Sequence, residues 1–253
     1  QIPLLPMRRR IKQMNYIVTK PASAMVEAVR NMRTSLLMPR DGRAPQVILS
    51  TSSVPGEGKT TNSIALAHSL VGTGKSVLLI EGDIRRNTLK NYFLTKTSEG
   101  EASRGGQGGL VTAAKEPEKL GDLLITDTQI GAHVLLGENT RENAADFFTS
   151  AAFEELMATL RQTYDYIIVD SPPVLLVPDA RIMARHADAV IFTVLWNGTG
   201  REQVQEALRM FASVGQDVTG LVLSQINPRR ARSYGYDSYG YGYGYGKQNY
   251  YTN

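Results

Sequence analysis

Short apolar runs recur along the chain, and segments of helical periodicity separate them. Most of the runs are continuous and rich in β-branched residues, as buried parallel strands tend to be. The first two lie about thirty residues apart, which is the length of one βαβ unit. A mostly parallel sheet is therefore predicted, with strands at 47–49, 77–80, 134–136, 166–169, 190–194 and 221–223.

Four segments carry apolar residues at helical spacing. One of them connects the first two strands, so these strands should be parallel. Another precedes the first strand, beginning after Pro21 and ending at Pro39. Apolar stripes of this kind are typical of packing faces, and we assign them to the core: Met25, Val29, Met32, Leu36; Ile64, Ala67, Leu70, Val71; Phe153, Leu156, Met157, Leu160; and Val204, Ala207, Leu208, Phe211. The predicted fold class is α/β, with helices on both faces of the sheet.

A chain of 253 residues with 42% apolar content is long enough for one sizeable α/β domain. We place this domain at residues 21–228, after an N-terminal arm (1–20) and before a C-terminal tail (229–253). The polar, glycine-rich stretch 95–109 is expected to be a mobile internal loop.

The composition narrows the class of protein. The chain has no cysteine, which excludes disulfides and thiolate metal sites and is compatible with a reducing cytosol. No run reaches the roughly 18 apolar residues of a membrane helix, and the start at Gln1 resembles a cut rather than a signal peptide. Net charge is only +4, but basic residues cluster at 8–10, 85–86 and 229–232. Such clusters could face anionic lipid, nucleic acid or phosphate, or form a solvated surface.

The sequence SSVPGEGKTT, residues 52–61, has the pattern of a phosphate-binding loop between a strand and a helix. Its glycines let backbone N–H groups surround phosphate oxygens, and the following helix adds its positive N-terminal end. Ser53 stands where the pattern has its first glycine, and the alternative is an ordinary strand-to-helix turn with an incidental lysine. The predicted nucleotide-binding residues are Ser53, Pro55, Gly56, Glu57, Gly58, Lys59, Thr60, Thr61 and Arg85.

Acidic residues end two of the predicted strands. Asp170 closes an apolar strand before Ser-Pro-Pro, and Asp83 follows the strand after the loop. Mg²⁺ prefers oxygen ligands, so we predict a site built from Thr60, Asp83 and Asp170, although a lone strand-end aspartate is often a helix cap. Glu81 or Asp83 could accept a substrate proton, and the sequence does not choose between them. The predicted catalytic residues are Lys59, Glu81, Asp83 and Asp170.

The tail holds eight of the chain's twelve tyrosines on glycine spacers. With the phosphate loop in the same chain, the repeat indicates a phosphorylation substrate. Without that loop, an aggregation-prone low-complexity segment would be the simpler interpretation. The predicted acceptors are Tyr234, Tyr236, Tyr239, Tyr241, Tyr243, Tyr245, Tyr250 and Tyr251.

Five motifs resemble those of the bacterial tyrosine kinases (BY-kinases) that control polysaccharide export. They are SSVPGEGKTT as Walker A, LLIEGDIRR as Walker A′, IIVDSPP as Walker B, EAVRNMR as E-x-x-R-x-x-R, and the tyrosine cluster. The resemblance implies a P-loop NTPase fold close to MinD/ParA-like ATPases. It also implies ATP and Mg²⁺ as cofactors, and autophosphorylation of the tail in trans within a ring homo-oligomer, such as an octamer. Glu27, Arg30 and Arg33 would lie at the subunit contact.

The resemblance further implies a place in the cell. The family works at the cytoplasmic face of the bacterial inner membrane, here through a membrane segment absent from this chain. Its partners would be the polysaccharide export machinery and a cognate tyrosine phosphatase, and no nucleic acid.

Three residues depart from the family pattern. Glu81 stands where the first Walker A′ aspartate is usual, Val54 replaces the signature lysine of MinD-like ATPases, and Ser224 replaces an asparagine near the adenine. The alternative function is a MinD/ParA-like ATPase that acts as a nucleotide-switched assembly module. The tail favours the kinase, because such a switch has no need of clustered acceptors.

Overall fold

The computed structural model describes residues 1–7, 9–38, 44–93, 108–140, 143–227 and 230–231. Nearly all of the predicted mobile loop and all eight predicted acceptor tyrosines lie outside the described residues. Their predicted properties therefore stay predictions.

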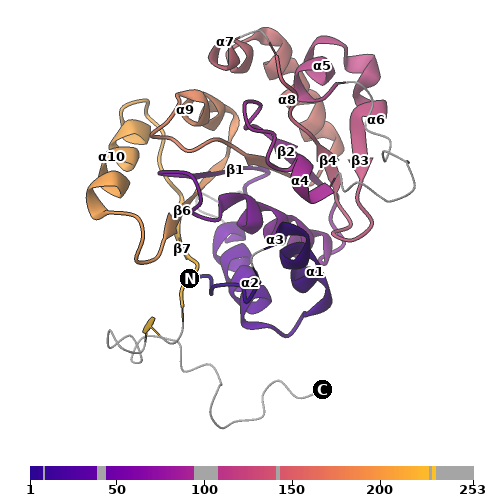
Figure 1. Cartoon of the computed structure of the whole chain (residues 1–253). Coiled ribbons are helices and arrows are strands. Elements are labelled where there is room, and N and C mark those ends of the chain that lie inside the picture. Colours follow the sequence, from indigo (N-terminus) through magenta and orange to yellow (C-terminus); the bar gives the residue numbers. More distant parts are fainter. Residues whose placement is uncertain (8, 39–43, 94–107, 141–142, 228–229, 232–253) are drawn as a thin grey trace.

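A seven-stranded sheet forms the centre of the molecule, in the order β3-β4-β2-β5-β1-β6-β7 (Figure 1). All neighbouring strands are parallel except β3 and β4. Each of the six predicted strands overlaps an observed one, and the mostly parallel sheet is confirmed. The strands are β1 (Val47–Ser52), β2 (Val77–Glu81), β3 (Leu124–Thr126), β4 (His133–Leu135), β5 (Tyr166–Asp170), β6 (Ala189–Leu195) and β7 (Gly220–Ser224).

The continuous apolar runs supply two separate cores, because successive side chains of a strand point to opposite faces of the sheet. On β1, Leu49 joins one core and Ile48 the other. On β5, Val169 and Ile168 divide in the same way. Both faces of the sheet are thus buried, which explains why the strands lack polar alternation.

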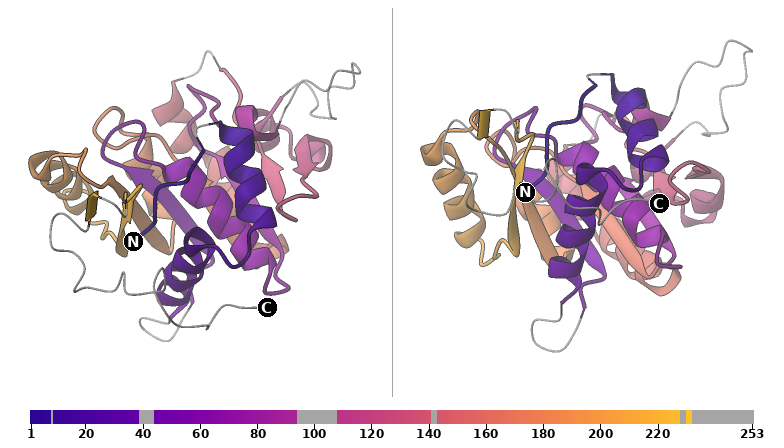
Figure 2. Two further views of the ribbon diagram at one scale, coloured as in Figure 1. Left: turned by 60° about the horizontal axis from the view of Figure 1, so that its bottom comes forward. Right: turned by 90° about the horizontal axis from the view of Figure 1, so that it is seen from below.

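Helices cover both faces (Figure 2). The core on one face includes residues of α1 (Arg10–Thr19), α2 (Ala24–Leu37), α3 (Lys59–Val71) and α4 (Lys90–Phe93). The other includes residues of α5 (Leu110–Lys115), α6 (Leu120–Leu123), α7 (Ala144–Phe148), α8 (Ala151–Thr163), α9 (Asp179–Met183) and α10 (Arg201–Ala212). Two short 3₁₀ segments, Pro117–Lys119 and Ala184–His186, adjoin α6 and α9. None of the described helices has the length and apolarity needed to cross a bilayer.

The sequence sets residues 1–20 apart as an arm, but residues 1–7 and 9–20 pack against the rest of the domain. Ile2, Met14 and Ile17 are buried in the same core as α3. The Ile2 N–H donates to the Leu223 carbonyl at 2.7 Å, and the Ile226 N–H donates to the Ile2 carbonyl at 3.1 Å. The N-terminus therefore runs beside the end of β7 (Figure 1). The folded unit extends to the start of the chain.

Candidate active site

The phosphate loop joins the end of β1 to the start of α3. Gly56 and Gly58 have φ values of 86° and 94°, a left-handed conformation that favours glycine. A Cβ atom on Gly58 would also approach the Gln225 amide nitrogen to 3.4 Å. These glycines let the chain turn sharply. Helix α3 therefore begins at Lys59, with its positive N-terminal end beside the cleft.

A buried carboxylate lies next to this loop. Because β1 and β5 are parallel neighbours, with Ser50 opposite Asp170, the end of β5 reaches the first turn of α3. Asp170 is 1% exposed, and it accepts hydrogen bonds from the Thr60 hydroxyl at 2.7 Å and the Ser63 hydroxyl at 3.1 Å. Lys59 Nζ lies 3.4 Å from the same carboxylate. The fold thus brings together Lys59, Thr60 and Asp170, three of the predicted site residues.

The oxygen donors of this cluster fit Mg²⁺. Thr60 and Asp170 offer one hydroxyl and one carboxylate, both hard oxygen ligands. Among the described residues no group of three or more His, Cys, Asp or Glu side chains could hold a metal. Mg²⁺ commonly completes its octahedral shell with water and substrate phosphates, so two protein ligands suffice.

Asp83 lines the cleft just after β2. One of its oxygens accepts the Arg86 N–H at 3.3 Å. Burial raises the pKa of Asp83 above its ordinary value, the nearby Asp170 charge adds to this, and the Lys59 cation opposes it. A carboxylate with a raised pKa that lines a cleft is suited to accept a proton.

Glu81 lies behind the cleft and does not line it. Its side chain is fully buried, and its two oxygens accept the N–H groups of Leu89 and Gly137, the latter at 3.0 Å. Burial raises the pKa of Glu81 to about 7. Both oxygens are thus engaged in joining the end of β2 to two loops.

The two arginines after Asp83 point to different partners. Arg85 forms an ion pair with the buried Asp179 of α9, at 3.1 Å from Nε to Oδ2, and does not line the cleft. Arg86 does line it. The geometry therefore does not favour the predicted nucleotide contact of Arg85, because its guanidinium is held by α9.

Six of the predicted loop residues line the cleft, and two do not. The Ser53 hydroxyl is buried and has no hydrogen-bond partner in the described part of the chain, and the Glu57 carboxylate is buried against the end of β6. The residues that do line it are Pro55, Gly56, Gly58, Lys59, Thr60 and Thr61.

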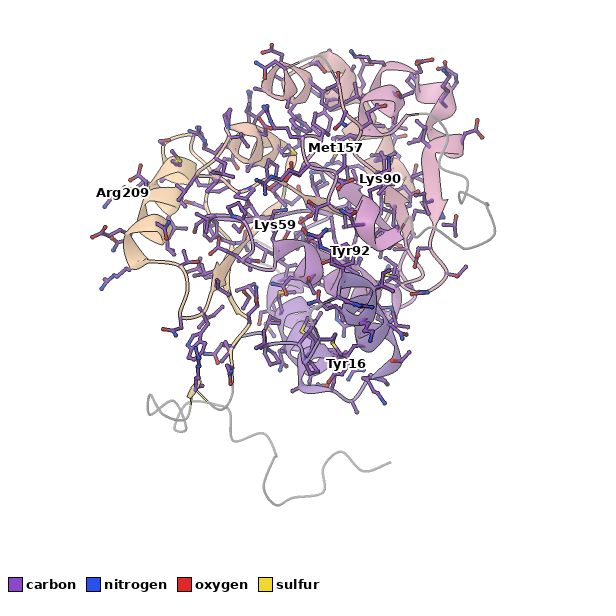
Figure 3. All side chains as sticks on the ribbon, in the orientation of Figure 1. Tyr16, Lys59, Lys90, Tyr92, Met157 and Arg209 are labelled. Carbon is purple, nitrogen blue, oxygen red and sulfur yellow. The ribbon has the colours of Figure 1, made fainter. Side chains whose placement is uncertain are left out.

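The cleft, of about 310 Å³, has further walls that sequence reasoning missed. Tyr92 of α4 lies 3.2 Å from the Thr61 hydroxyl, and the Arg10 guanidinium lies 5.8 Å from the centre of its ring. Burial raises the pKa of Tyr92. Figure 3 labels Lys59 and Tyr92 on the helices that border the cleft. No sequence pattern pointed to these walls, whereas Ser63 could have been found, since it lies one helical turn after Thr60. The missed lining residues include Ile2, Leu4, Arg10, Gln13, Tyr92 and Gln225, whereas the resemblance had already placed Ser224 near the adenine.

The three residues predicted for a subunit contact lie on α2. Arg30 and Glu27 form an ion pair of 2.7 Å with both side chains about 40% exposed. Arg33 instead donates to the carbonyl and hydroxyl oxygens of Ser69 on α3. The first two are accessible to a partner, whereas Arg33 ties α2 to α3. Their place in an interface stays a prediction.

Known proteins resemble this chain in sequence and in fold. The profile of the AAA domain family matches residues 46–219. Tyrosine-protein kinase CpsD of Streptococcus pneumoniae is 32% identical over 72% of this chain and 77% of its own length. Tyrosine-protein kinase wzc of Salmonella typhimurium is 30% identical over 91% of this chain and 31% of its own length. The kinase domain of the Escherichia coli tyrosine kinase ETK superposes with a TM-score of 0.76 at 25% identity, over 85% of this chain and 80% of that domain.

The chain spans only 29% to 31% of the length of the longer curated relatives that it matches. The family match at residues 46–219 nevertheless includes the phosphate loop, both acidic strand ends and helices α3 to α10. The chain belongs to the AAA domain family and, within it, to the bacterial tyrosine-protein kinases.

Proposed function

We propose that this chain is the kinase domain of an ATP-dependent protein-tyrosine autokinase, with its own C-terminal tyrosines as acceptors. The observation that carries the proposal is the buried cluster of Lys59, Thr60 and Asp170 under the phosphate loop, with Asp83 on the same cleft. These groups can hold a nucleoside triphosphate and receive a proton. The tail supplies hydroxyl groups in the same chain.

The loop side of the cleft would hold the phosphates. Lys59 would leave Asp170 for the β- and γ-phosphate oxygens, since its present distance to the carboxylate is a long 3.4 Å. Thr60 and Asp170 would bind Mg²⁺, which supplies positive charge to the phosphates of bound ATP. Positioning and charge neutralisation would provide most of the rate enhancement, because phosphoryl transfer needs little covalent work from a protein.

Asp83 is the better candidate for the proton acceptor. As a tyrosine oxygen forms its bond to the γ-phosphorus, the bond from phosphorus to the β,γ-bridging oxygen breaks and ADP leaves. The phenolic proton passes to a carboxylate. Asp83 lines the cleft, whereas both oxygens of Glu81 already accept backbone hydrogen bonds away from it.

The relatives extend the proposal to the cellular setting. We place the reaction in trans within a ring homo-oligomer, with Glu27, Arg30 and Arg33 at the subunit contact. The ring would lie at the cytoplasmic face of the inner membrane and regulate polysaccharide export, and a cognate phosphatase would reset the tail. Support comes from family membership and from the exposed Glu27–Arg30 pair.

Tandem mass spectrometry after incubation with Mg·ATP tests the activity. We expect phosphate on tail tyrosines of the wild-type protein and none on Lys59→Met. Lys75→Met removes an exposed lysine next to β2 and should label like the wild type. ATP hydrolysis without any labelled tyrosine would instead support the alternative of a nucleotide-switched assembly module.

A mixing experiment tests the trans reaction. The acceptor is Lys59→Met, which keeps its tyrosines, and the donor is the full chain with all eight tail tyrosines changed to phenylalanine. Phosphate on the acceptor's tail is expected. An unlabelled acceptor beside a wild-type protein that labels itself would show a reaction in cis.

A further inference from the structure

Glu57 is a fully buried carboxylate inside the phosphate loop that does not line the cleft. One of its oxygens accepts the Val54 N–H at 2.8 Å. The other accepts the Leu195 N–H at 3.1 Å and a short hydrogen bond from the Thr199 hydroxyl. We name this group, formed by Glu57, Thr199 and the N–H groups of Val54 and Leu195, the Glu57 clamp.

The clamp spans two parts of the molecule. Val54 lies in the phosphate loop itself, whereas Leu195 ends β6 and Thr199 lies in the turn before α10. The same loop is held from a third side, since the Ser224 hydroxyl donates to the Glu57 carbonyl and the Gln225 amide donates to the Gly56 carbonyl at 2.8 Å. The ends of β6 and β7 thus support the loop from behind.

A carboxylate without solvent contact is costly unless donors satisfy its oxygens. Three donors do so here, so the carboxylate stabilises one arrangement of the loop and of the turn 195–200 together. A binding site whose N–H groups are already in place loses less free energy on ordering when its ligand arrives. The clamp is placed to provide this preorganisation.

We propose that Glu57 is a positioning residue, which sets the affinity of the phosphate loop for nucleotide by fixing the loop to the turn 195–200. The inference rests on the proposed nucleotide binding and deepens it, because it makes Thr199 a determinant of ATP affinity. Thr199 does not line the cleft and its hydroxyl donates to Glu57, so the loss of that hydroxyl would reach the nucleotide through Glu57.

Thr199→Val is the decisive variant, because it keeps the shape of the side chain and removes only the hydroxyl donor. We expect the Kd for Mg·ATP, measured by calorimetry, to rise about tenfold, the effect of one lost hydrogen bond to a charged group. At saturating ATP the kcat should stay within about twofold of the wild type, while the KM for ATP rises with the Kd. The matched control is Thr159→Val, which removes an exposed hydroxyl on α8.

A double-variant cycle tests the route through Glu57. Glu57→Gln is expected to weaken Mg·ATP binding more than Thr199→Val, because its amide nitrogen would face a backbone N–H. The double variant should bind Mg·ATP about as weakly as Glu57→Gln alone, because the Thr199 hydroxyl acts through the Glu57 carboxylate that is already lost. Glu155→Gln, at an exposed position of α8, is the control for Glu57→Gln.

Trp196 provides a second readout within the turn. It is the chain's only tryptophan, and its backbone N–H donates to the Ser224 carbonyl at 3.0 Å. Adding Mg·ATP to the wild type should change the Trp196 fluorescence. In Thr199→Val the midpoint of this fluorescence titration should rise by the same factor as the Kd from calorimetry.

Unchanged Mg·ATP affinity in Thr199→Val would overturn the inference. So would effects that simply multiply in the double variant. Should Glu57→Gln fail to fold, Thr199→Val still decides. These results concern only the clamp, whereas a wild-type protein that fails to bind Mg·ATP would overturn the proposed function as well.

Discussion

Individual acidic residues around the cleft differ in role because their hydrogen-bond partners differ. Asp170 faces two hydroxyls and a lysine, Glu81 faces two backbone N–H groups, and Glu57 is enclosed by the clamp. Asp83 lines the cleft and has one backbone donor. Carboxylates that lie away from the cleft and accept backbone N–H groups, such as Glu81 and Glu57, stabilise structure, whereas Asp170 beside Thr60 and Lys59 and Asp83 on the cleft wall are placed to take part in chemistry.

Asp83→Asn tests this distinction in the phosphoryl transfer. Asparagine keeps the size of the side chain but cannot accept the phenolic proton. We expect kcat for tail phosphorylation to fall about 10²- to 10⁴-fold, the range for loss of a general base. Initial rates at saturating Mg·ATP measure the effect, and calorimetry should still detect nucleotide binding.

Glu81→Gln is the comparison for Asp83→Asn. Its amide nitrogen would face one of the two N–H groups, so the free energy of unfolding should fall by about 1–3 kcal/mol. Since Glu81 does not line the cleft, kcat should change far less than in Asp83→Asn. A larger loss of kcat in Glu81→Gln, with stability retained, would make Glu81 the base.

At the scale of elements, both ends of the sheet depend on polar side chains. The cleft lies at the carboxyl ends of β1, β2 and β5. At the amino ends of the strands, Asp188, just before β6, holds neighbouring elements together. Its carboxylate accepts the N–H groups of Gln46 and Val47 and pairs with Arg161 of α8 at 2.8 Å. One side chain therefore aligns two strands and a helix.

Asp188→Asn should destabilise the protein in a pH-dependent way. Burial raises the pKa of Asp188. Arg161 and the two N–H groups lower it by more, so the pKa lies below its ordinary value. The carboxylate therefore stabilises the native state fully above about pH 4, the ordinary aspartate range, and this contribution disappears as pH falls through the lowered pKa.

Because Asp188 and Arg161 are about one-third exposed, we expect a loss of only about 1–2 kcal/mol at pH 7. Urea denaturation at pH 7 and near pH 3 measures it. Asp217→Asn, at an exposed position, should change stability by less than about 0.5 kcal/mol. An equal loss at both pH values would show that the charge of Asp188 contributes nothing.

The whole molecule shows which features a sequence can reveal. Strands buried on both faces leave continuous apolar runs, and a phosphate loop needs glycines at fixed places, so both were predictable. Sequence reasoning missed β3 because a strand of three residues is too short to show the alternation of side chains that marks a strand. Whether Arg85 or Arg86 meets the cleft depends on α9, which is distant in sequence. The burial of Glu57 likewise depends on the turn after β6, and no local pattern encodes such long-range contacts.

The N-terminal residues allow a test of the extent of the folded domain. The sequence pattern separates them from the domain, whereas the structure packs them into one of its cores. Ile17 of α1 is 3% exposed and Ile11 of the same helix is 47% exposed. If residues 1–20 fold with the domain, Ile17→Ala should lower the free energy of unfolding by about 2–5 kcal/mol, and Ile11→Ala by far less. Urea denaturation should show one transition in both variants. Equal stabilities would mean that α1 adds nothing to the fold, and the cleft would then lose the wall that Arg10 and Gln13 provide.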